Sequence, residues 1–181
     1  MTRIAIVERA EMNPEQARVY DAAKESGSPV GGPYQAYIRL PKLFEACQNL
    51  RGSLSSGPLS RREQQIVNLT VARHWNARYP WFAQVRNSRA MGIEEAVIDA
   101  INARKAPTLP DARERTCFLV SRELLANKGL SQEAYAEAEK IMGVEGLVAL
   151  VASTGSFSMT CLTANSFTID PPPANPTPLM A

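Results

Sequence analysis

The stretch RHWNARYPWFAQ, residues 73–84, gathers the groups of this chain that are best able to do chemistry. It holds the only histidine, His74, both tryptophans and Tyr79. His74 is the one side chain here that would titrate near neutral pH without perturbation, so it is a candidate general acid or base. A lone histidine is also commonly structural, and Arg73 and Arg78 would lower its pKa if they lay close. The stretch therefore predicts either a catalytic site or an aromatic part of the core.

The aromatic residues of the same stretch could also form a binding surface. Trp81, Gln84 and Ser88 share one helix face by their i, i+3, i+7 spacing. Two tryptophans and a tyrosine close together can stack against a flat organic ring, and they can equally pack in a core. Both interpretations stay open from the residues alone.

A second group of polar residues lies on the helix expected from residue 60 to residue 75 or 76. Helical spacing puts five residues on one face: Arg61, Gln65, Asn68, Ala72 and Trp75. Asn68 lies in the apolar run IVNLTV, and a buried amide without a partner costs about 1–3 kcal/mol. Gln65, one turn away, could be that partner in a helix–helix contact. Alternatively, both amides line a small polar pocket in an apolar wall.

Standard metal, nucleotide and nucleophile motifs are absent from the sequence. One histidine without HxxxH or HxxE spacing predicts no conventional metal site. Cys47, Cys117 and Cys161 lie far apart without a CxxC pair, each among apolar neighbours, which is typical of small core residues. No GxxxxGK[ST] loop is present. We therefore expect neither a metal nor a cofactor.

The segments that must position these groups read as a string of helices. Asn13 before Pro14 is a typical helix start, and Ser60 with Glu63 forms a capping-box pattern. Gly129 and Gly143 are expected to end helices. The expected helices cover residues 14–25, 34–39, 42–54, 60–75, 80–92, 94–103, 111–129, 131–143 and 145–166. Since no stretch alternates with period two, the prediction is an all-α fold.

Length and composition are those of one ordinary globular domain. The 181 residues carry a net charge of +2, which favours neither nucleic acid nor an anionic membrane as a partner. Serines and threonines interrupt the stretch GLVALVASTGSFSMTCL, so no apolar run reaches the roughly 20 residues that span a bilayer. The N-terminal stretch MTRIAIVERAEMN does not have the pattern of a secretory signal. We therefore expect a cytoplasmic protein.

The C-terminal stretch DPPPANPTPLMA holds five prolines and cannot form a regular helix or a central strand. It is either mobile or an extended arm laid on a neighbouring subunit. The expected organisation is an N-terminal helical segment (1–27), a helical domain (28–170) and the Pro-rich tail (171–181).

Several motifs together resemble the carboxymuconolactone decarboxylase family, whose superfamily includes the AhpD-like alkylhydroperoxidases. The motifs are GGPYQAYIRLP, LSRREQQIVNLTV, YPWFAQ and the late TANSF, and the resemblance spans residues 28–170. It implies an AhpD-like helical bundle that assembles as a homo-oligomer, a dimer, trimer or hexamer. It also implies one of two chemistries: cofactor-free decarboxylation of a lactone acid, or thiol-based peroxide reduction.

This sequence departs from the family pattern at the reactive positions. The family's Glu falls on Gln65, its Cys pair on Ala77 and Pro80, and its His on Gln84. Without a thiolate there is no nucleophile for peroxide, so peroxide reduction is not expected. A glutamine cannot transfer protons as histidine does, but it can hydrogen-bond a carboxylate or an enolate oxygen.

The sequence therefore supports a first hypothesis of a cofactor-independent lyase that decarboxylates a small cyclic carboxylic acid or lactone from aromatic-compound catabolism. The expected catalytic residues are His74, Gln84 and Tyr79. The expected substrate-binding residues are Gln65, Asn68, Trp81, Arg61 and Arg73. The alternatives are a homo-oligomer that binds a small molecule without turning it over, and another reaction on the same fold, such as oxygenation or isomerisation.

Overall fold

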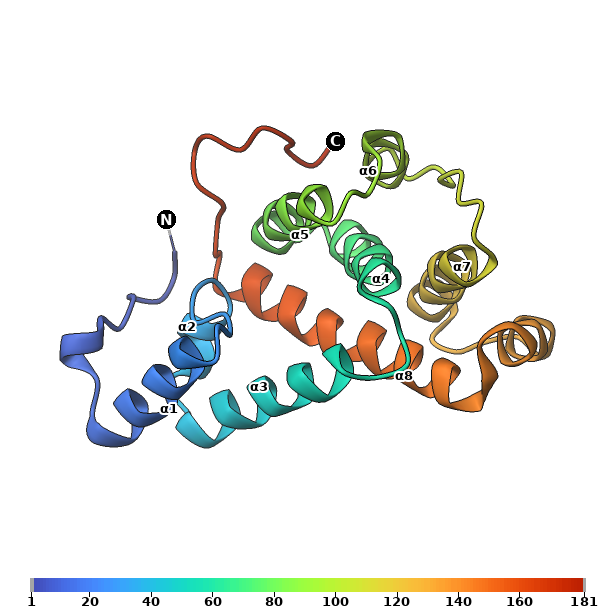
Figure 1. Cartoon of the computed structure of the whole chain (residues 1–181). Coiled ribbons are helices and arrows are strands. Elements are labelled where there is room, and N and C mark those ends of the chain that lie inside the picture. The colour runs from blue at the N-terminus through green and yellow to red at the C-terminus, as the bar shows by residue number, and fades with distance from the viewer. Residues whose placement is uncertain (1, 181) are drawn as a thin grey trace.

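The computed structural model describes residues 2–180, and within that range every regular element is a helix (Figure 1). This confirms the all-α prediction. The elements are a 3₁₀ turn η1 (Arg9–Glu11) and the helices α1 (Pro14–Glu25), α2 (Tyr34–Tyr37), α3 (Pro41–Ser55), α4 (Arg61–His74), α5 (Arg78–Ala90), α6 (Glu95–Asn102), α7 (Ala112–Asn127) and α8 (Gln132–Ser166).

The predicted helix starts are correct where a side chain caps the backbone. The Asn13 side chain accepts a hydrogen bond from the Gln16 N–H at 2.9 Å. At the start of α4, the Ser60 hydroxyl accepts from the Glu63 N–H at 3.2 Å, and the Glu63 carboxylate accepts from the Ser60 N–H at 2.7 Å. These contacts satisfy N–H groups that have no partner inside a helix.

Two predicted helix limits were wrong, at the start of α5 and at the end of α7. Helix α5 begins at Arg78, so Pro80 is its third residue, where its missing N–H costs no helical hydrogen bond. The left-handed residue that ends α7 is Lys128, with φ of 64°, and not Gly129. The predicted helix end at Gly143 is confirmed: its φ of 69° and ψ of 167° are not helical, and α8 consists of two helices that meet at a kink there.

Helix α4 lies at the centre of the larger hydrophobic core and contacts α5, α6, α7 and α8 (Figure 1). Its residues Ile66, Val67, Leu69 and Val71 are all completely buried. Because consecutive residues of a helix point in different directions, these buried side chains show that α4 is packed on several sides. A second, smaller core joins α1, α2 and α3 through Val19, Tyr37, Phe44 and their neighbours.

The Pro-rich tail packs against its own chain, a third arrangement beside the two that the sequence left open. The Trp81 indole N–H donates to the Thr177 carbonyl at 2.9 Å. Asn102 donates to the Pro178 carbonyl and accepts from the Met180 N–H, both at 3.0 Å. The tail thus runs over α5 towards α6 (Figure 1).

Candidate functional site

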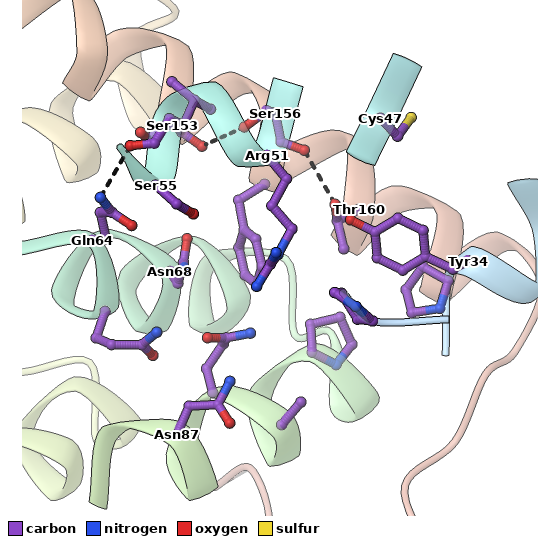
Figure 2. Close-up of a pocket in the computed structure, with 18 of the residues that line it drawn as sticks. Tyr34, Cys47, Arg51, Ser55, Gln64, Asn68, Asn87, Ser153, Ser156 and Thr160 are labelled. Atoms are coloured by element: carbon purple, nitrogen blue, oxygen red, sulfur yellow. Dashed lines mark hydrogen bonds between the residues drawn. The ribbon is translucent and has the colours of Figure 1, made fainter. Parts of the chain in front are cut away.

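A cavity of about 820 Å³ lies between the larger and the smaller core, and we call it the central cavity (Figure 2). Helices α3, α4, α5 and α8 and the loop before α2 form its walls. Its polar lining includes Arg51, Arg61, Arg86, Gln64, Gln65, Asn68, Gln84, Asn87, Ser153, Ser156 and Thr160. This volume lies in the range of small-molecule sites.

All the charged side chains that line the central cavity are positive. Three arginines line it, Arg51, Arg61 and Arg86, and no aspartate or glutamate among the described residues does. Within residues 2–180, none of the three is in an ion pair. Figure 2 shows Arg51 extending from α3 into the cavity, between Asn68 and Tyr34. All three are exposed residues, and unpaired guanidinium groups around a cavity favour an anionic ligand, above all a carboxylate.

Amide side chains form the second group of polar residues in the cavity, and they differ in whether they have hydrogen-bond partners. Gln64 donates to the carbonyls of Leu54 and Leu59 at 3.0 and 2.9 Å, so it ties the loop before α4 to the helix. Gln65 accepts a hydrogen bond from the Ser88 hydroxyl at 3.3 Å, and within residues 2–180 no hydrogen bond joins it to Asn68. The buried Oε1 of Gln84 has no partner among the described residues. Gln84 and Asn68 are thus free to bind a ligand.

Tyrosines close the α2 side of the central cavity. Burial raises the pKa of Tyr34 to about 12, although the nearby charge of Arg51 opposes the effect. Tyr34 is therefore a neutral phenol at neutral pH. The ring of Tyr79 packs on the Gly31–Gly32 turn, where Gly32 has a φ of +60°. A Cβ atom at Gly32 would lie 2.1 Å from Tyr79 Cε1, so this turn requires glycine to hold the ring in place.

Five of the eight predicted site residues line the central cavity: Arg61, Gln65, Asn68, Tyr79 and Gln84. The other three do not. Trp81 is completely buried, with its indole bound to the tail. Arg73 is buried and donates to the carbonyl oxygens of Asn102 and Met180 at 2.6 and 3.0 Å. His74 lies beside another, smaller cavity.

The prediction that His74 shares a pocket with Gln84 is therefore corrected, and helix geometry explains the error. His74 follows Gln65 on α4 by nine residues, and at about 100° per residue this puts it on the opposite face of the helix. Proximity in sequence to the aromatic stretch did not mean proximity in space.

Sequence reasoning missed the part of the site that comes from other helices, mainly Tyr34, Arg51, Asn87 and the hydroxyls of α8. One usable signal existed for the last group. Ser153, Ser156 and Thr160 recur at helical spacing in an otherwise apolar helix, and all three line the cavity. No local pattern distinguished Arg51 from other surface arginines.

The cysteines are buried thiols. Cys117 and Cys161 are in the core, whereas Cys47 is a buried residue in the wall of the central cavity. Burial raises the pKa of all three thiols, that of Cys117 to about 12. The thiols are therefore protonated at neutral pH, when they are poor nucleophiles.

No protein-family model and no curated protein matches this chain. Solved structures do match. An uncharacterized peroxidase-related protein from Ralstonia eutropha, described as an alkylhydroperoxidase AhpD core, has a TM-score of 0.76 at 17% identity, over 95% of this chain and 93% of its own. An uncharacterized peroxidase-related protein from a Silicibacter species has a TM-score of 0.77 at 17% identity, and the match covers 99% of this chain and 96% of that protein.

A third solved structure is similar over a shorter part of this chain. It is a protein of unknown function from Agrobacterium tumefaciens, with a TM-score of 0.69 at 18% identity, over 78% of this chain and 99% of its own. At such identities the likeness establishes the fold. The chain therefore has the helical fold of the AhpD-like, peroxidase-related proteins.

Proposed function

We propose that the central cavity binds a small organic acid and that the protein is a cofactor-independent lyase acting on a small cyclic carboxylic acid or lactone, of the kind formed in aromatic-compound breakdown. The observation that carries the proposal is the set of three arginines without a carboxylate partner around free amides. Hydrogen bonds between guanidinium and carboxylate are about twice as strong as neutral ones.

A decarboxylation in this cavity would use its donors in two roles. Arg61 or Arg86 holds the substrate carboxylate. As the bond to CO2 breaks, its electron pair moves onto the conjugated carbonyl oxygen, where Arg51 and the Nε2 amide group of Gln84 donate hydrogen bonds that stabilise the enolate. The phenol of Tyr34 then protonates the carbon, and the tyrosinate recovers its proton from water. Because His74 lies outside the cavity, Tyr34 replaces it in this scheme.

Binding without turnover is the second candidate function. It is favoured by the absence, among the described lining residues, of a group that titrates near neutral pH, since arginine, tyrosine and a buried thiol all ionise well above it. Peroxide reduction, which the descriptions of the structural neighbours would suggest, has less support. The positions of the redox pair hold Ala77 and Pro80, and Cys47 is a single protonated thiol.

Turnover of γ-carboxymuconolactone by the purified protein separates the two candidates. The lyase predicts release of CO2 and loss of substrate absorbance, reduced at least about 100-fold in Tyr34→Phe, the usual scale for a removed general acid. Tyr135→Phe is the matched control, because Tyr135 is an exposed tyrosine outside the cavity. Binding of the lactone without CO2 release would leave the second candidate.

We also propose that the protein is a homo-oligomer whose interface includes an exposed apolar stripe on α8. The stripe consists of Val144, Val148, Val151, Met159 and Leu162, which are 38–62% exposed and spaced like one helix face. Such exposed stripes mark interaction surfaces. By length and composition alone α8 could also cross a membrane, a test that core helices of soluble proteins pass as well. A monomer of 19.8 kDa in sedimentation would contradict the oligomer.

A further inference from the structure

A second cavity, of about 240 Å³, lies on the other side of α4, and we call it the cationic cavity. It is formed by the end of α4, by α7, and by the end of α6 with the turn that follows it. Its basic residues are Arg73, His74, Arg104, Lys105 and Arg122. None of the residues that line it also lines the central cavity, so the two cavities are separate.

The positive charge of the cationic cavity is not balanced by the protein within residues 2–180. No aspartate or glutamate of that range lines it, and none of its arginines is in an ion pair. Arg73 and Arg104 both donate to the neutral amide oxygen of Asn76. The proximity of Arg104 contributes to the lowered pKa values of Arg73 and His74, after burial. Gathered cations that repel one another are stabilised by a bound anion.

The remaining wall of the cationic cavity is apolar. Ile101, Phe118 and Leu125 line it, and the Arg122 guanidinium lies 5.3 Å from the centre of the Phe118 ring. An arginine stacked on an aromatic ring keeps its N–H edge free for a planar acceptor. A ligand that fits both parts has an anionic oxygen group at one end and an apolar body at the other.

We propose that the cationic cavity is a second binding site, for a small aromatic or branched carboxylate whose charged end meets Arg104 and Arg122 and whose apolar end meets Phe118 and Leu125. Its volume admits a ligand of about benzoate size. The site does not depend on the function proposed for the central cavity, because the two share no residue.

The single histidine makes this proposal directly testable. Because His74 is the only histidine of the chain, its imidazole Cε1–H resonance reports on the cationic cavity alone. Benzoate titrated into the full-length protein is expected to shift this resonance saturably. It is also expected to raise the pKa of His74, since a bound anion offsets the charges facing it, which are Arg73, Arg104, Lys105 and Arg122.

Variants and a second probe assign the effect to the cavity. Arg104→Gln and Arg122→Gln are each expected to weaken benzoate binding about tenfold, the scale of one lost charge-assisted contact. Arg51→Gln, in the central cavity, leaves the His74 titration unchanged. The proposal is overturned if benzoate does not shift the His74 resonance saturably. It is also overturned if Arg104→Gln binds benzoate as tightly as the wild type, provided that this variant melts like the wild type. The proposal would also be overturned if inorganic phosphate bound as tightly as benzoate, because the apolar wall would then contribute nothing to binding.

Discussion

Substitution of Gly32 by alanine tests whether the turn before α2 positions the wall of the central cavity. Gly32 combines a φ of +60° with a ring contact, since a Cβ atom there would meet Tyr79 Cε1 at 2.1 Å. The left-handed conformation costs an alanine about 1 kcal/mol. Relieving the overlap requires the ring to move, and overpacking of this kind costs about 2 kcal/mol. The expected loss in the free energy of unfolding is about 3 kcal/mol.

Gly27→Ala separates the cost of the left-handed conformation from the cost of the overlap with the ring. Gly27 also has a positive φ, of +69°, but nothing lies within 4 Å of its virtual Cβ atom. This variant should therefore lose only the conformational part, about 1 kcal/mol. For a chain of this length each kcal/mol lowers Tm by about 2–4 °C, so Gly32→Ala should melt about 6–12 °C below the wild type and clearly below Gly27→Ala.

Thermal unfolding followed by circular dichroism measures both variants, and a double mutant completes the cycle. In a Tyr79→Ala background the ring is gone, so adding Gly32→Ala should cost only about 1 kcal/mol. If Gly32→Ala melts together with Gly27→Ala, or if its cost is the same with and without the Tyr79 ring, the reasoning about this turn is refuted.

Three further predictions concern the tail, the thiol and the histidine. Asn102→Ala removes two hydrogen bonds to the tail and should cost about 2 kcal/mol, measured by urea unfolding; an unchanged midpoint would show that the tail adds no stability. Because the pKa of Cys47 is raised, its alkylation by iodoacetamide at pH 8 should be slower than that of free cysteine and should accelerate as pH rises further, as mass spectrometry of the labelled peptide can show. Fast labelling of this peptide at pH 7 would contradict a buried thiol. Because the folded-state pKa of His74 is lowered, the unfolded chain takes up its proton first, so stability is lost as pH falls below about 6.5. Between pH 7 and pH 5, the free energy of unfolding should fall less in His74→Gln than in the wild type. An equal fall in both proteins would argue against a lowered pKa of His74.

The sequence predicted what local chemistry controls. The capping residues Asn13 and Ser60 start their helices as expected, because a side-chain acceptor three residues before an N–H acts within one turn. Of the two alternatives that the sequence left open for Asn68, the structure has the one in which Asn68 and Gln65 line a cavity. Gln65 and Gln84, on different helices, do line one cavity, as the family resemblance implied.

The sequence could not predict what depends on packing between distant segments. His74 and Gln65 belong to one helix, but only its neighbours decide which face opens on which cavity. Arg51 comes from α3, and its role depends on how the smaller core docks on the larger one. From the sequence the tail was either mobile or an arm on a neighbouring subunit, and only its contacts with Trp81 and Asn102 show that it packs on its own chain.

The central claim is that the central cavity recognises the negative charge of a small organic acid. Isothermal titration calorimetry of a cyclic carboxylic acid and of its neutral amide, which has nearly the same shape, tests this most directly. The account predicts that the acid binds at least about tenfold more tightly than the amide. Arg61→Gln or Arg86→Gln, whichever arginine holds the carboxylate, should remove most of this preference, while Arg18→Gln, outside the cavity, keeps it. Equal affinities for acid and amide, or a preference that survives in Arg51→Gln, Arg61→Gln and Arg86→Gln alike, would contradict it.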